Sequence, residues 1–116
     1  MEKTNVVLKK TIARCEKQAR KEAVPLWKEV AEELKRSNSN KRPVNLSKLE
    51  RVCEAGDTVV VPGKVAGYGR LSKDICVAAF NFSKSAKENI EEVGETLSIL
   101  ELLEEKPQAS GIRIIK

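Results

Sequence analysis

The sequence has 116 residues, of which 22 are lysine or arginine and 17 are aspartate or glutamate, and it contains no histidine. The lack of histidine removes the commonest general base at neutral pH. Cys15, Cys53 and Cys76 are odd in number, widely spaced and without any histidine, which argues against a disulfide framework and a zinc site, so we interpret them as small buried apolar residues. No apolar run approaches the roughly 20 residues of a membrane span, and no signal-peptide pattern is present. We therefore expect a single cytoplasmic domain over residues 1–116. We expect this domain to have no metal, no cofactor and no membrane contact.

The first predicted element is a helix over residues 4–23. Its apolar side chains recur every three or four residues and form a stripe of Leu8, Ile12, Cys15 and Ala19. Cations recur at the same spacings on the opposite face, at Lys10, Arg14, Lys17 and Lys21. Because this row contains no acid, we expect it to contact phosphate groups, and an ordinary solvated face is the alternative.

A second helix is predicted to begin at Pro25, which suits the first helical turn. Its apolar face includes Trp27, which we interpret as a core anchor rather than a platform for stacking a base. Residues 1–36 therefore predict a helical hairpin. A polar and basic linker over residues 37–43 follows, and its Lys41 and Arg42 are further candidates for contact with a polyanion.

Residues 44–116 alternate between short strands and short helices. The expected strands are 44–46, 58–61, 75–80 and 112–115. The expected helices are one opened by a capping box of Ser47 and Glu50 and ended at Gly56, one capped by Ser83 and ended at Gly94, and one over 99–105 with a capping box of Ser98 and Glu101. The sequence thus predicts an α/β fold, a small mixed domain preceded by an N-terminal helical hairpin that either packs on it or reaches away.

Charge is distributed unevenly along the chain. Residues 1–75 carry 17 cations and 10 acids, whereas residues 76–116 carry 5 cations and 7 acids. Such asymmetry is typical of a protein that binds a polyanion through one part of its surface. Six of these seven acids, which we call the late acids, are Glu91, Glu92, Glu95, Glu101, Glu104 and Glu105. We interpret them as a solvated side, with a basic protein neighbour as the alternative.

The stretch VPGKVAGYGRLSKD at 61–74 does not fit a nucleotide-binding loop. The phosphate-loop pattern requires glycine where Thr58 stands and a hydroxyl where Val65 stands. The dinucleotide pattern GxGxxG begins at Gly67 but has Ser72 in place of its third glycine. We therefore expect no nucleotide or other small-molecule substrate here.

The same stretch carries the groups that bind a nucleic-acid backbone. Its cations Lys64, Arg70 and Lys73 can neutralise phosphates, and Tyr68 can stack on a sugar or base. Glycine lets a backbone approach a ligand closely, at Gly63, Gly67 and Gly69. The glycines can also serve simply to shape turns, and both interpretations remain open.

Several segments together match the pattern of one known family. They are PLW at 25–27, VNLSKL at 44–49, GDTVVVPGKV at 56–65, GYG at 67–69, LSK at 71–73, AFNFS at 79–83 and SGIRII at 110–115. In these the chain closely resembles the archaeal and eukaryotic large-subunit ribosomal protein eighteen-e, which shares a fold with the bacterial large-subunit protein fifteen. The short chain is similar to the archaeal type.

The resemblance implies irregular strand-strand-helix repeats and a structural, non-enzymatic role in the large ribosomal subunit. The implied partners are large-subunit ribosomal RNA and neighbouring ribosomal proteins. A free-standing RNA-binding module or assembly factor outside the mature ribosome is the alternative. An enzyme that holds magnesium on Asp57 and Asp74 is a third reading, although such aspartates are more often turn residues.

Overall fold

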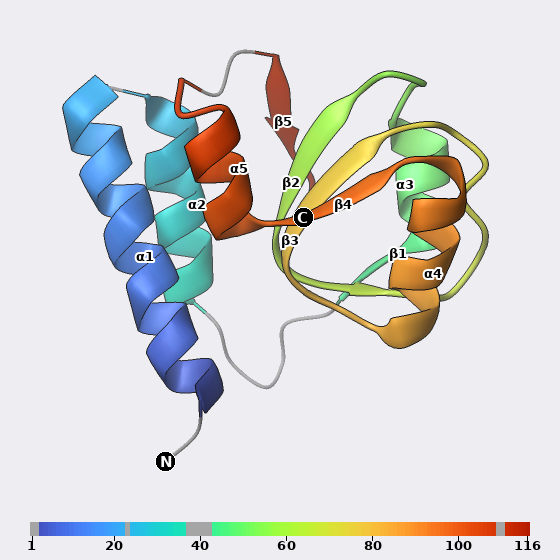
Figure 1. Cartoon of the computed structure of the whole chain (residues 1–116), viewed down its shortest axis with the longest axis horizontal. Helices are drawn as coiled ribbons and strands as arrows, with labels where there is room; N and C mark the ends of the chain where they lie inside the picture. Colours follow the sequence, from blue (N-terminus) through green and yellow to red (C-terminus); the bar gives the residue numbers. More distant parts are fainter. Residues whose placement is uncertain (1–2, 23, 37–42, 109–110) are drawn as a thin grey trace.

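The structure is a computed structural model that describes residues 3–22, 24–36, 43–108 and 111–116. It has a mixed α/β fold in which an N-terminal helical hairpin precedes a mostly parallel sheet (Figure 1), as the sequence predicts. In chain order the elements are α1 (Lys3–Glu22), α2 (Pro25–Lys35), β1 (Val44–Asn45), α3 (Leu46–Val52), β2 (Thr58–Ala66), β3 (Cys76–Phe82), α4 (Lys84–Val93), β4 (Glu95–Ser98), α5 (Ile99–Glu105) and β5 (Ile112–Ile114). Within the described ranges, no helix combines the length and apolarity that crossing a membrane requires.

The central strand β2 has parallel partners on both sides. The strands lie in the order β1-β2-β3-β4, and β5 also pairs with β2. On the side away from β3, Thr58–Val60 pair with β5 and Val65–Ala66 pair with β1. The register with β3 shifts between Val61 and Lys64, around Pro62, which has no N–H to donate to a ladder.

Helices cover both faces of the sheet, so the central strands are buried on both sides. Val59 and Val61 belong to the core cluster beneath α3 and α4, whereas Val60 and Ala78 belong to the cluster that contains side chains of α1, α2 and α5. Figure 1 shows the same arrangement, with α1, α2 and α5 on one side and α3 and α4 on the other. This two-sided burial explains why Val59–Val61 of β2 and Val77–Ala79 of β3 are continuous apolar runs.

The hairpin packs on the sheet and does not reach away from it. Trp27 is 0% exposed, and its Nε1–H donates to the carbonyl oxygen of Pro107 at 2.8 Å. Gln18 of α1 donates to the same oxygen at 3.2 Å, and Glu16 forms an ion pair with Lys35 of α2. Trp27 is therefore the predicted core anchor.

The cysteines mostly behave as predicted. Cys15 and Cys53 are buried, and Cys76 is half-buried. Burial raises the pKa of the Cys15 thiol to about 12 and that of Cys76 to about 11. Both thiols therefore stay protonated at neutral pH and pack as apolar groups.

Two of the three predicted helix caps are confirmed. Ser83 caps α4 by accepting from the N–H of Ala86, and Ser98 with Glu101 forms the expected capping box of α5. These caps lie within one turn of their partners, so the local sequence is sufficient to specify them.

The capping box expected at Ser47 and Glu50 is wrong. The N-cap of α3 is Asn45, without a side-chain cap, so Ser47 lies inside the helix. The Glu50 carboxylate accepts instead from Ser72. A partner distant in sequence has replaced the local one.

The strand predictions need two corrections. The strand β4 was missed because its four residues follow Gly94 directly and lie at an edge of the sheet, where charged and polar side chains are tolerated. The strand β2 continues to Ala66, so Gly63 and Lys64 lie in a strand and not in a loop.

Candidate nucleic-acid interface

The four predicted cations of α1, which we call the α1 row, are all exposed: Lys10, Arg14, Lys17 and Lys21. The apolar stripe on the other face of α1 packs into the core formed with α2 and α5, so the row faces away from the sheet. No ion pair among the described residues involves the row. Its charge is therefore available to an external anion.

Residues 67–75, which we call the crossover, join the parallel strands β2 and β3 without a helix. The crossover runs beside α3 and in the same direction. The carbonyl of Tyr68 accepts from the N–H of Ser47, at the start of the helix, at 3.1 Å. The carbonyl of Asp74 accepts from the N–H of Gly56, beyond the end of the helix, at 2.7 Å. Both ends of the crossover are thus fixed to the α3 segment.

The middle of the crossover is held from two sides. On the α3 side, the Glu50 carboxylate accepts from the N–H of Ser72 at 2.9 Å and from its hydroxyl at 2.8 Å. These bonds, the backbone one foremost, lower the pKa of Glu50. On the α4 side, the Asn89 amide donates to the carbonyl of buried Leu71 at 3.0 Å and accepts from its N–H at 3.4 Å. Such a preorganised backbone has little freedom left to lose when a ligand binds.

Two glycines of the crossover lie in close contact with the protein itself. A Cβ on Gly67 would lie 2.1 Å from Oγ of Ser85 in α4. A Cβ on Gly69, whose φ is +91°, would lie 2.8 Å from the backbone nitrogen of Ser47 in α3. These close contacts are made to α3 and α4 and support the interpretation that the glycines shape the turn, whereas close approach to a ligand stays a prediction. The third glycine, Gly63, lies in β2.

The crossover presents Tyr68 and Arg70 to solvent. Tyr68 is 74% exposed, and Arg70 is also exposed, as is Lys64 on β2. No ion pair or side-chain hydrogen bond with another described residue involves these three side chains. An aromatic ring on a fixed backbone suits stacking on a base. The linker candidates Lys41 and Arg42 lie outside the described residues.

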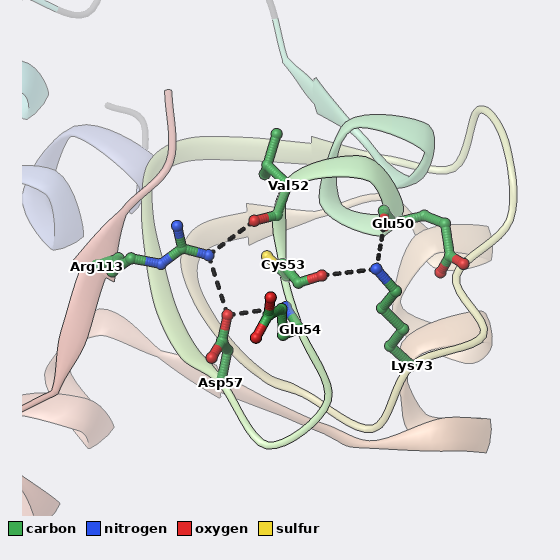
Figure 2. Close-up of polar contacts among 7 residues, drawn as sticks. All are labelled: Glu50, Val52, Cys53, Glu54, Asp57, Lys73 and Arg113. Atoms are coloured by element: carbon green, nitrogen blue, oxygen red, sulfur yellow. Dashed lines mark hydrogen bonds and ion pairs between the residues drawn. The ribbon is translucent and has the colours of Figure 1, made fainter.

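Lys73 has a structural task that the sequence did not suggest. Its Nζ donates to the carbonyl oxygens of Glu50 and Cys53, both at 2.7 Å (Figure 2). These carbonyls belong to the last turn of α3, which leaves acceptors free and carries the negative end of the helix dipole. Only one N–H of this ammonium group remains for a phosphate, so Lys73 is a weaker candidate than Arg70.

Arg113 of β5 reaches the same end of α3 from another side (Figure 2). Its guanidinium donates to the carbonyl of Val52 at 2.8 Å and to the carboxylate of Asp57 at 3.0 Å. Asp57 also accepts from the N–H of Glu54 at 2.9 Å. This backbone bond foremost, and Arg113 after it, lower the pKa of Asp57. Asp57 thus acts as a turn residue paired with a cation.

Two residues that hold the crossover were missed in the sequence. Asn89 lies on the same face of α4 as the buried residues Ala86 and Ile90. A polar residue in an otherwise apolar helix face indicates a buried hydrogen bond, so the sequence offered a signal for Asn89. Glu50 gave no such signal because its serine partner lies 22 positions away.

The late acids are exposed, as predicted, and belong to α4, β4 and α5: Glu91, Glu92, Glu95, Glu101, Glu104 and Glu105. No ion pair among the described residues involves them. Negative charge thus gathers on elements distinct from α1 and the crossover.

Comparison with known proteins gives consistent matches. A family model that covers the ribosomal proteins 50S-L15 and 50S-L18e, together with their 60S counterpart, matches residues 25–97. The chain is 41% identical to the large ribosomal subunit protein eL18 of Haloarcula marismortui over 116 residues, covering 100% of both chains. It is 44% identical to the eL18 of Methanopyrus kandleri, covering 97% of this chain and 94% of the relative. It is 39% identical to the eL18 of Methanoregula boonei, covering 100% and 97% respectively.

Proposed function

The chain belongs to the ribosomal protein family that includes 50S-L15 and 50S-L18e, and from this premise we propose that it is a structural component of the large ribosomal subunit. In this proposal it binds folded large-subunit ribosomal RNA in the cytoplasm, beside neighbouring ribosomal proteins, and catalyses no reaction. The α1 row and the crossover supply the contacts to the RNA.

The proposal rests on the exposure of the α1 row and on its lack of ion pairs with the described residues. Four cations line the outer face of a helix whose other face is packed, and no ion pair among the described residues involves them. Elsewhere the protein uses cations internally, as in the pairing of Lys116 with Glu29 and Glu33. The row thus keeps its charge for an outside partner, and phosphate is the anion that RNA offers.

The physical role follows from the repulsion between phosphates. RNA segments that converge in a compact fold must bring negative charges together. A protein that places fixed cations beside them lowers this cost, and release of condensed counterions drives the binding. The crossover adds a second contact at a low cost in conformational entropy, because hydrogen bonds to α3 and α4 already fix the backbone that carries Tyr68 and Arg70.

The proposal is tested by the salt dependence of binding to transcribed large-subunit RNA. About six phosphate contacts would reduce affinity by roughly three decades between 50 and 200 mM salt. Replacing the α1 row by glutamine should reduce the slope of log K against log salt by about 3 to 4. The matched control removes four exposed lysines on other elements and should leave the slope unchanged: Lys28, Lys84, Lys87 and Lys106.

A complex that is insensitive to salt, or a slope that the row variant does not change, would contradict the proposal. The alternative, an RNA-binding module or assembly factor outside the mature ribosome, uses the same contacts. It differs in where the protein resides, which sedimentation distinguishes.

A further inference from the structure

Two groups of candidate RNA contacts, the α1 row and the crossover, lie on opposite sides of the molecule. The α1 row lies on the outer face of the hairpin, at one end of the longest axis (Figure 1). The crossover, yellow-green in Figure 1, passes along the other end beside α3 and α4, to which Tyr68 and Leu71 are bonded. The Cα trace measures 35 × 34 × 19 Å, so the molecule is a disc with one group at either end.

The orientation of α1 also separates the two groups. The apolar stripe of α1 points toward α2 and α5, and these helices lie between α1 and the sheet. The α1 row, on the other face of the same helix, therefore points away from the crossover. A single straight RNA duplex docked on the row would therefore lie on the side of the hairpin that faces away from the crossover.

The body between the two groups is packed as one piece. The hairpin and the sheet share a core cluster in which Trp27, Val60 and Ala78 are each 0% exposed. The carbonyl of Pro107 accepts from both Trp27 and Gln18, which ties the end of α5 to the hairpin. The separation and relative direction of the two groups are therefore set by the fold.

We propose that the protein bridges two separate segments of RNA, one held by the α1 row and the other by the crossover with Tyr68 and Arg70. The inference rests on the proposed function, because it takes RNA as the ligand of both groups. It adds that the packed body acts as a spacer of fixed length. The protein then fixes the distance between two RNA segments as well as neutralising their charge.

Hydroxyl radicals released from tethered iron test the bridge, because they cleave only RNA close to the tether. The large subunit is rebuilt from its RNA, its other proteins and one variant at a time. Ala13→Cys carries the tether within the α1 row, and Asp74→Cys carries it on the crossover, and both positions are exposed. Cys76→Ala forms the background because Cys76 is only half-buried. Glu104→Cys on α5, one of the late acids, is the matched tether that belongs to neither group.

The bridge predicts that Ala13→Cys and Asp74→Cys cleave two RNA segments that are not paired with each other. Cleavage of one duplex from both positions would overturn the bridge and leave RNA binding intact. Strong cleavage from Glu104→Cys alone would place the RNA on the acidic side and also overturn it. Failure of every variant and of the parent chain to enter the subunit would instead contradict the proposed function.

Discussion

Substitution of Gly69 by alanine tests whether contact with α3 determines the shape of the crossover. Gly69 has φ +91°, where an alanine costs roughly 1–2 kcal/mol. Its new Cβ would also lie 2.7 Å from Cβ and 2.8 Å from the nitrogen of Ser47, so the backbone of α3 or of the crossover must shift. Overpacking of this kind costs about 1–3 kcal/mol, which brings the total to about 2–5 kcal/mol.

Gly56 provides the matched control for this substitution. Its φ is +92°, but a Cβ there would meet nothing within 4 Å, so Gly56→Ala carries only the cost of the backbone conformation. The gain from a stiffer unfolded chain is the same in both variants and cancels in their difference. Urea denaturation should therefore show that Gly69→Ala loses about 1–3 kcal/mol more unfolding free energy than Gly56→Ala. Equal losses would refute the claim that the contact with Ser47 shapes the crossover.

Three further substitutions test the other contacts that hold the crossover and the hairpin. Asn89→Ala leaves the buried backbone groups of Leu71 without partners and should lower the free energy of unfolding, measured by urea denaturation, by about 1–3 kcal/mol. A loss below about 0.5 kcal/mol, which is typical of an exposed site, would contradict the role of Asn89. The pKa of Glu50 is lower in the folded state than its ordinary value of 4.5. The bonds to Ser72 therefore stabilise the fold fully above pH 4.5, and this contribution is lost as pH falls through the folded pKa. Glu50→Gln should therefore flatten the acid side of the stability curve, and an unchanged acid limb would count against the bond. Trp27→Phe removes the hydrogen bond to Pro107 and should lower the free energy of unfolding by about 1–3 kcal/mol. Unfolding is followed by circular dichroism because the variant has lost the only tryptophan. An unchanged unfolding midpoint would show that the bond is dispensable.

The features that the sequence predicted correctly depend on neighbours within a few residues. The stripe of Leu8, Ile12, Cys15 and Ala19 follows from helical periodicity alone, and the opposite cationic row follows with it. The caps of α4 and α5 likewise lie within one turn of their partners. Hence the fold class, the helical hairpin and the exposure of the α1 row could be predicted before the structure was known.

The features that local sequence could not predict depend on contacts between distant parts of the chain. Glu50 satisfies the local capping pattern with Ser47, yet it binds Ser72 because the crossover returns along α3. Lys73 donates to carbonyls some 20 residues away in sequence, which its neighbours in the chain do not indicate, and its contact with phosphates stays a prediction. Arg113 reaches the same helix end from 61 positions away. A cation's sequence neighbours do not tell whether its partner is the protein or a ligand, because the partner is set by the path of the backbone.

Sedimentation of the tagged chain from its own cells tests the central claim most directly. Lysates are run on sucrose gradients with magnesium, before and after a moderate-salt wash, and the tag is quantified against large-subunit RNA. The account predicts stoichiometric migration with the large subunit that survives the wash, since fixed contacts on two sides hold the protein. Migration at the top of the gradient, or complete loss in mild salt, would contradict a structural role and favour a free RNA-binding factor.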